Sequence, residues 1–154
     1  MYQHIMVPLD GSELAECVLP HVESIATGCN VSKITLVRVV PPLHMYGGTE
    51  TRISPEDQKI LEEDSIEVSS TYLEEKVQAL KDKGVLVETK VLLGNILDAL
   101  CDYIVKNDVD LVIIATHGRS GVSRLFLGSI ADRLLHQAPV PILMVRAPGS
   151  VHRD

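Results

Sequence analysis

The chain has 154 residues, 45% of them hydrophobic and 23% charged, which is the composition of one globular domain with a substantial core. Its formal net charge of −7 argues against nucleic acid or an anionic membrane as a partner, and no apolar run reaches transmembrane length. The cysteines, Cys17, Cys29 and Cys101, follow no disulfide or metal-binding spacing, so we expect reduced thiols in a cytoplasmic protein.

Strand and helix patterns alternate along the chain. Apolar, β-branched runs predict five strands, at 4–9, 33–40, 85–93, 110–115 and 141–146. Helical spacing of apolar residues predicts four helices, at 13–27, 55–83, 96–107 and 128–137. Ser54 is expected to cap the second helix, with Pro55 at its first position. Pro20 lies inside the first helix and is expected to bend it or to shift its register.

This alternation predicts a single doubly wound α/β domain over 1–147, followed by a tail at 148–154. We expect a five-stranded parallel sheet in the order 3-2-1-4-5, with helices on both faces. The strand expected at 110–115 is apolar from Leu111 to Ala115, so it is expected to be central and covered on both faces. Ligands of such sheets bind beyond the carboxyl ends of the strands, where the winding direction reverses. The segments that begin at Asp10 and Thr116 are therefore the expected site.

Residues 116–137, THGRSGVSRLFLGSIADRLLHQ, place glycines, hydroxyls and arginines between a buried strand and an amphipathic helix. If the helix begins near Gly128 and Ser129, its first N–H groups are unpaired and its end is partly positive, which suits a phosphate. Gly118 would let the loop fold over the phosphates, and Arg119 could supply positive charge. The alternative is a plain helix start, in which Ser129 caps the helix and the arginine is solvated.

These residues resemble the motif of the universal stress protein family, in its nucleotide-binding branch. The motif is a Gly, two residues, a second Gly, nine residues, and then Gly-Ser or Gly-Thr; Gly118, Gly128 and Ser129 match its later elements. The first element falls on Ala115, whose added methyl group can tighten a pocket at a point of close approach. The resemblance covers nearly the whole chain, including a first strand that ends in Pro-x-Asp.

The resemblance implies a dimer that binds ATP, alone or with Mg²⁺, or another adenine nucleotide, and acts in stress survival. The site residues that it implies are Pro8, Asp10, Val39, Thr116, His117, Gly118, Arg119, Gly128, Ser129 and Ile130. Asp10 and the backbone of Val39 would face the adenine and ribose, and the glycines with Ser129 would face the phosphates. The alternative for Asp10 is a helix cap, a role that Ser12 also performs well.

Three functions remain open. We favour a nucleotide-binding regulator that acts through conformation or partner binding over a partner-binding protein of the same fold without nucleotide, which Ala115 supports. The third is an enzyme, an ATP-dependent transferase or hydrolase, which would need an identifiable base, nucleophile or second substrate pocket. The chain has no P-loop and offers no convincing set of these, so we expect at most slow ATP hydrolysis. We expect no metal site from the pair Cys17 and His21, since two ligands alone do not hold a metal.

The last strand, 141–146, is expected at an edge of the sheet. It is too apolar to leave in water, so pairing with its two-fold copy would give a homodimer. The alternative is a strand covered by the chain's own helices. The loop 41–53 follows the second strand at the ligand edge, where it could close as a lid.

Overall fold

The computed structural model describes residues 1–43, 53–80, 84–116 and 128–147. The elements in chain order are β1 (His4–Pro8), α1 (Glu13–Glu16), α2 (Leu19–Cys29), β2 (Lys33–Val40), α3 (Pro55–Gln78), β3 (Leu86–Leu93), α4 (Ile96–Lys106), β4 (Leu111–Ala115), α5 (Ser129–Gln137) and β5 (Ile142–Val145). The strands form one sheet in the order β3-β2-β1-β4-β5, and every pairing is parallel. The predicted doubly wound fold and its strand order are confirmed.

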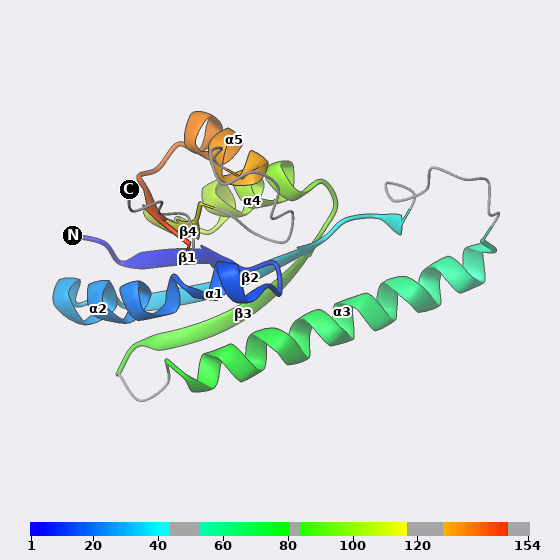
Figure 1. Ribbon diagram of the computed structural model, residues 1–154, viewed down its shortest axis with the longest axis horizontal. Coiled ribbons are helices and arrows are strands. Elements are labelled where there is room, and N and C mark those ends of the chain that lie inside the picture. Colours follow the sequence, from blue (N-terminus) through cyan, green and yellow to red (C-terminus); the bar gives the residue numbers. More distant parts are fainter. Residues whose placement is uncertain (44–52, 81–83, 117–127, 148–154) are drawn as a thin grey trace, which may run out of the picture.

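Helices cover both faces of the sheet, with α4 and α5 on one face and α1, α2 and α3 on the other (Figure 1). Successive side chains of β1 point to opposite faces of the sheet, because side chains alternate along a strand. Ile5 and Val7 belong to the core cluster under α1, α2 and α3, whereas Met6 belongs to the cluster under α4 and α5. Each fully buried aliphatic side chain contributes about 1.5–3 kcal/mol relative to exposure.

The central strand β4 is buried along its whole length, as predicted from its unbroken apolar run. β1 lies beside it, and from β1 the chain winds first to β2 and β3 and later returns to β4 and β5. The winding direction therefore reverses between β1 and β4. The carboxyl ends of these two strands are the place where an open α/β sheet leaves a crevice for a ligand.

The predicted helix over 13–27 is wrong as a single element. α1 ends at Glu16, and α2 starts again at Leu19 with Pro20 in its first turn. A proline lacks the N–H group that an interior position must donate, but a first-turn position has no such bond to lose. The chain therefore breaks the helix ahead of Pro20 instead of bending through it.

The predicted end of the long helix at Lys83 is also wrong. α3 begins as predicted, with Ser54 as its cap, but it ends at Gln78. Ala79 and Leu80 continue as a tight turn, each donating to the carbonyl three residues before it. Every other predicted boundary differs from the observed one by at most two residues.

The amino-terminal part of α3 extends past the sheet (Figure 1). All side chains from 53 to 64 are exposed, including those of Glu62, Glu63 and Asp64. These acidic side chains form a solvated face at the start of α3. The next turns of α3 approach β2 and form one wall of the cavity described below.

Candidate functional site

A cavity of about 710 Å³ opens at the carboxyl edge of the sheet, where β1, β2 and β4 end. Seven of the predicted site residues line it, namely Pro8, Asp10, Val39, Thr116, Gly128, Ser129 and Ile130. His117, Gly118 and Arg119 lie outside the described residues. The fold thus brings together, around one cavity, residues that are far apart in the sequence. Their contact with a nucleotide stays a prediction.

The start of α5 forms one end of the cavity. Gly128 is the N-cap, with φ −56° and ψ 139°, and no side chain caps the helix. The N–H of Gly128 donates to the carbonyl of Thr116 at 2.6 Å, which fixes the helix start against the end of β4. The alternative in which Ser129 caps the helix is wrong, because Ser129 is already its first residue.

Backbone donors therefore face the cavity at this end. Ser129, Ile130 and Ala131 form the first turn of α5, and all three line the cavity. First-turn N–H groups have no partner within their own helix, and the aligned peptide dipoles place about half a positive charge there. This end of the cavity is suited to an anion such as a phosphate.

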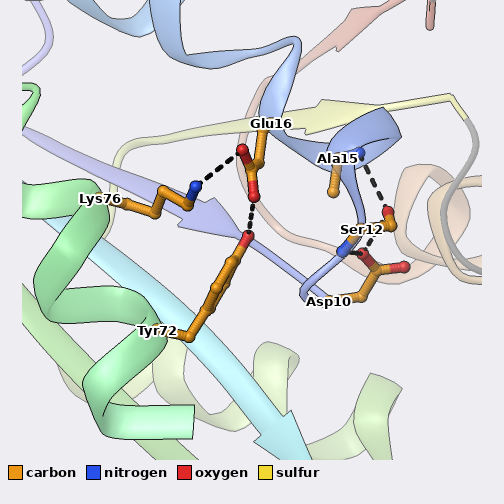
Figure 2. A network of polar contacts seen from close by, with 6 residues as sticks. All are labelled: Asp10, Ser12, Ala15, Glu16, Tyr72 and Lys76. Carbon is orange, nitrogen blue, oxygen red and sulfur yellow. Dashed lines mark hydrogen bonds and ion pairs between the residues drawn. The ribbon is translucent and has the colours of Figure 1, made fainter.

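The turn after β1 forms another part of the wall. The Asp10 carboxylate accepts hydrogen bonds through Oδ1 from the N–H and the hydroxyl of Ser12, at 2.9 and 2.6 Å (Figure 2). Ser12 in turn caps α1 by accepting from the N–H of Ala15 at 3.2 Å. The capping role considered for Asp10 thus belongs to Ser12, while Asp10 orients that cap and also lines the cavity.

Arg38 is a cavity residue that the sequence reasoning missed. It lies in β2 next to Val39 and lines the same cavity. A Cβ atom added to Gly11 would lie 3.1–3.2 Å from Nη1, Cζ and Nη2 of Arg38, and Gly11 has φ +87°. A side chain at Gly11 is thus opposed both by the backbone conformation and by the guanidinium. The signal for Arg38 was available, since it is the one charge inside the apolar run ITLVRVV.

A polar cluster beside the cavity joins α1 to α3. The Tyr72 hydroxyl donates to Glu16 Oε1 at 3.0 Å, and Lys76 Nζ donates to Glu16 Oε2 at 2.9 Å (Figure 2). The Arg38 guanidinium lies 5.2 Å from the centroid of the Tyr72 ring, and the Lys76 ammonium lies 5.3 Å from it. Both cations are within the range of attraction to the ring face.

Burial, and next the hydrogen bond to Glu16, raise the pKa of Tyr72 well above its usual value. The phenol therefore stays protonated at neutral pH and acts as a hydrogen-bond donor. The cluster fixes α3, and with it the α3 wall of the cavity, against α1 and β2. Sequence reasoning had no means of finding it, because Glu16 and Tyr72 are far apart in the chain.

The wall formed by α3 was not predicted either. Leu61, Ser65, Val68 and Ser69 face the cavity from this helix, across from the end of β2. They add apolar surface and two hydroxyls to the predicted site, whose residues come from β1, β2, the start of α5 and the segments that follow β1 and β4.

Ala115, at the first element of the motif, is 5% exposed and packs in the core cluster under α1, α2 and α3. It also contributes to the cavity wall. Its methyl group thus lies among core side chains, and the cavity is present despite it.

No helix within the described segments is long and apolar enough to cross a membrane. No three His, Cys, Asp or Glu side chains of those segments gather as a possible metal site. Cys17 is the C-cap of α1 and His21 lies in α2, so this pair does not share one helix. The loop 44–52, the main part of the expected lid, lies outside the described residues.

Comparison with known proteins agrees with this architecture. Residues 1–146 match the model of the universal stress protein family. The universal stress protein Sll1388 of Synechocystis is 30% identical, and the match covers 94% of this chain and 98% of that protein. The solved structure of MJ0577, a universal stress protein of Methanocaldococcus jannaschii, superimposes with a TM-score of 0.83 at 23% identity, covering 97% of this chain and 99% of that one.

Two further solved structures of the same fold contain adenine nucleotides. One is a universal stress protein in complex with cAMP, with a TM-score of 0.66 at 19% identity over 95% of this chain and 98% of that one. The other is a family member from Arabidopsis thaliana with AMP bound, with a TM-score of 0.66 at 18% identity over 96% of this chain and 93% of that one. The match to the family model spans nearly the whole chain, and this protein belongs to the universal stress protein family.

Proposed function

We propose that this protein is a stress-response regulator that binds an adenine nucleotide, ATP alone or with Mg²⁺, at the carboxyl edge of its sheet. It acts through conformation or partner binding. One observation carries the proposal: the uncapped start of α5 and the Asp10 turn face the same cavity. The AMP and cAMP found in structures of the same fold support it.

The cavity fits a nucleotide in size and in chemistry. Its volume of about 710 Å³ is within the range of small-molecule sites, which run from roughly 300 to 1,000 Å³. The first turn of α5 offers N–H donors for the phosphates. Pro8, Val39 and Ile130 supply apolar surface for a base, and Asp10 supplies an acceptor for an amine or a sugar hydroxyl.

In this proposal Gly118, Gly128 and Ser129 contact the phosphates, and Asp10 with the Val39 backbone faces adenine and ribose. Thr116, His117, Arg119 and Ile130 lie nearby. Mg²⁺ would be held mainly by phosphate oxygens, because it usually keeps several waters and takes few protein ligands.

The protein is further proposed to form a homodimer through β5. β5 is an edge strand, paired only with β4 among the described strands. Ile142, Leu143 and Met144 are each only partly buried. An apolar edge with open backbone groups is normally covered, and a two-fold copy of itself is the simplest cover.

A matched pair of substitutions tests the nucleotide site. The backbone of Gly128 has a negative φ, which Asp and Asn also adopt without strain, and both residues are good helix N-caps. They have the same shape and differ in one negative charge. We expect Gly128→Asp to bind ATP about 10- to 100-fold more weakly than Gly128→Asn in titration calorimetry, because its carboxylate would repel the phosphates.

The thermal stability of the two variants without ligand should remain close to that of the parent. Gly28→Asp adds the same charge at an exposed position away from the cavity and should leave ATP binding unchanged. Equal ATP affinities of Gly128→Asp and Gly128→Asn would show that no phosphate lies at the start of α5.

A further inference from the structure

Ser69 is an unusual residue of the cavity wall. It lies in α3, is 2% exposed and lines the cavity. Within the described parts of the chain three polar side chains are buried: His4, Thr35 and Ser69. His4 and Thr35 hydrogen-bond to each other, whereas the Ser69 hydroxyl has no hydrogen-bond partner among the described residues. A buried hydroxyl without a partner is unfavourable, so a group that enters the cavity would gain by bonding to it.

Arg38 presents hydrogen-bond donors in the same region. Its Nη1, Cζ and Nη2 atoms are all about equally close to the position of a Gly11 Cβ, so one flat face of the guanidinium lies against Gly11. The N–H groups of a guanidinium lie in its plane, so they point away from that contact. The ring of Tyr72 further restrains the group, at 5.2 Å from its centroid. Arg38 is therefore a restrained guanidinium at the cavity wall.

The chemistry around these groups favours a neutral, hydroxyl-bearing ligand. Asp10 supplies acceptors, Arg38 supplies donors and Ser69 can act as both. Glu62 and Asp64 line the same side of the cavity, so a second phosphate there would meet negative charge. A sugar carries neighbouring hydroxyls that each donate and accept, which matches this mixed set.

We propose that Arg38 and Ser69 bind the ribose hydroxyls of the nucleotide and make the protein select ATP over analogues that lack one of these hydroxyls. This inference rests on the proposed function, since it places the phosphates at α5 and the sugar between Asp10 and α3. Both residues lie outside the glycine motif. Their role depends on α3, which the Tyr72 and Glu16 contact holds in place.

Titration calorimetry with ATP, 2′-deoxy-ATP and 3′-deoxy-ATP tests the proposal. We expect the parent protein to bind ATP about two- to tenfold more tightly than at least one deoxy analogue. This ratio corresponds to the loss of one hydrogen bond. Ser69→Ala should weaken ATP binding by a similar factor, leave binding of that analogue unchanged, and so remove the preference. Arg38→Lys keeps the charge but loses the fork, and it should reduce the preference in the same way.

Two controls separate recognition from structure. Ser69→Ala should leave the melting temperature of the ligand-free protein unchanged or raise it, since this hydroxyl bonds to no described residue and alanine favours helix. Ser70→Ala makes the same change beside it, at a hydroxyl that bonds to Glu74 and does not line the cavity, and should keep the preference for ATP.

The failures are distinguishable. Equal binding of ATP and both deoxy analogues by the parent, or an equal loss for all three in Ser69→Ala, overturns the ribose assignment and leaves the nucleotide site standing. No binding of any of the three by the parent overturns both proposals.

Discussion

The two ends of the parallel sheet differ in how they satisfy their buried polar groups. At the amino end the chain satisfies them itself: His4 Nε2 and Thr35 Oγ1 are 2.8 Å apart, and His4 Nδ1 lies 2.9 Å from the carbonyl oxygen of Asn107. The Asp110 carboxylate accepts from the N–H groups of Gln3 and His4. At the carboxyl end the same sheet opens into a cavity lined by a helix start without a side-chain cap and by the buried hydroxyl of Ser69.

This difference indicates that the amino end stabilises the fold and the carboxyl end serves a ligand. A polar group that the chain satisfies itself adds to stability. A buried polar group without a hydrogen-bond partner lowers the stability of the fold, and a ligand that supplies the partner gains binding energy from it. Substitutions at the amino end should therefore change the free energy of unfolding, and substitutions at the carboxyl end should change binding.

The largest effect on stability is expected at the amino end. Thr35→Val keeps the shape of a fully buried side chain but leaves His4 Nε2 without its partner. We expect a loss of about 1–3 kcal/mol in the free energy of unfolding, measured by urea denaturation. In titration with ATP, Thr35→Val should bind with the same affinity as the parent.

Thr27→Val makes the same chemical change on an exposed turn of α2 and should stay within about 0.5 kcal/mol of the parent. A tenfold loss of ATP affinity in folded Thr35→Val would contradict the division between the two ends, because the amino end would then also contribute to ligand binding.

A second effect concerns the side edge at β5. Met144→Lys places a charge on the partly buried edge strand and should convert a dimer to a monomer at micromolar concentration. Light scattering measures the mass of both proteins. If the monomer still binds ATP, then assembly and ligand binding use separate edges of the sheet, and the ligand role belongs to the carboxyl end alone. A parent protein that is already monomeric would rule out the β5 interface.

The smallest effect is expected from the cluster beside the cavity. The pKa of Tyr72 is raised in the folded state, so its contribution to stability is complete below the unfolded value of about 10 and is lost as the pH rises through the folded value. Tyr72→Phe loses the hydrogen bond to Glu16 but keeps the ring under Arg38 and Lys76. At pH 7 we expect it to be about 0.5–1.5 kcal/mol less stable than the parent.

The difference in the free energy of unfolding between the parent and Tyr72→Phe should shrink above pH 10. Unfolding of the parent then releases the phenol proton of Tyr72, which Tyr72→Phe does not carry. Denaturation curves of both proteins between pH 7 and 11 measure it. A difference that stays constant over this range would mean that the hydroxyl is not held as described.

Much of the fold was predictable because its signals are local. The apolar run of β4 and the Ser54-Pro55 start of α3 depend on neighbours in the sequence, and the structure confirms both. The helix break before Pro20 was only partly predicted. The sequence indicates that Pro20 disturbs the helix, but packing decides whether the helix bends there or a new helix starts.

The candidate site was predictable only in its motif residues. Asp10, Gly128 and Ser129 follow strands or begin a helix, so the topology places them at one edge. Ser69 could not be placed in the same way, because it reaches the cavity only where α3 packs across β2. Arg38 left a signal, as the one charge inside an apolar run, but the sequence alone does not place it beside α3. Which helix covers which strand is a tertiary property, and neither periodicity nor turn chemistry encodes it directly.

The most direct test of the central claim is thermal unfolding of the nucleotide-free protein with and without Mg-ATP. At about 100 times the dissociation constant, a ligand that binds only the native state adds about 2.7 kcal/mol, which corresponds to a rise of roughly 5–11 °C for a domain of this size. We predict a rise of this order in the parent and in Gly28→Asp, and a much smaller one in Gly128→Asp. No rise at millimolar Mg-ATP would contradict the account, and the function would then have to be sought in protein partners.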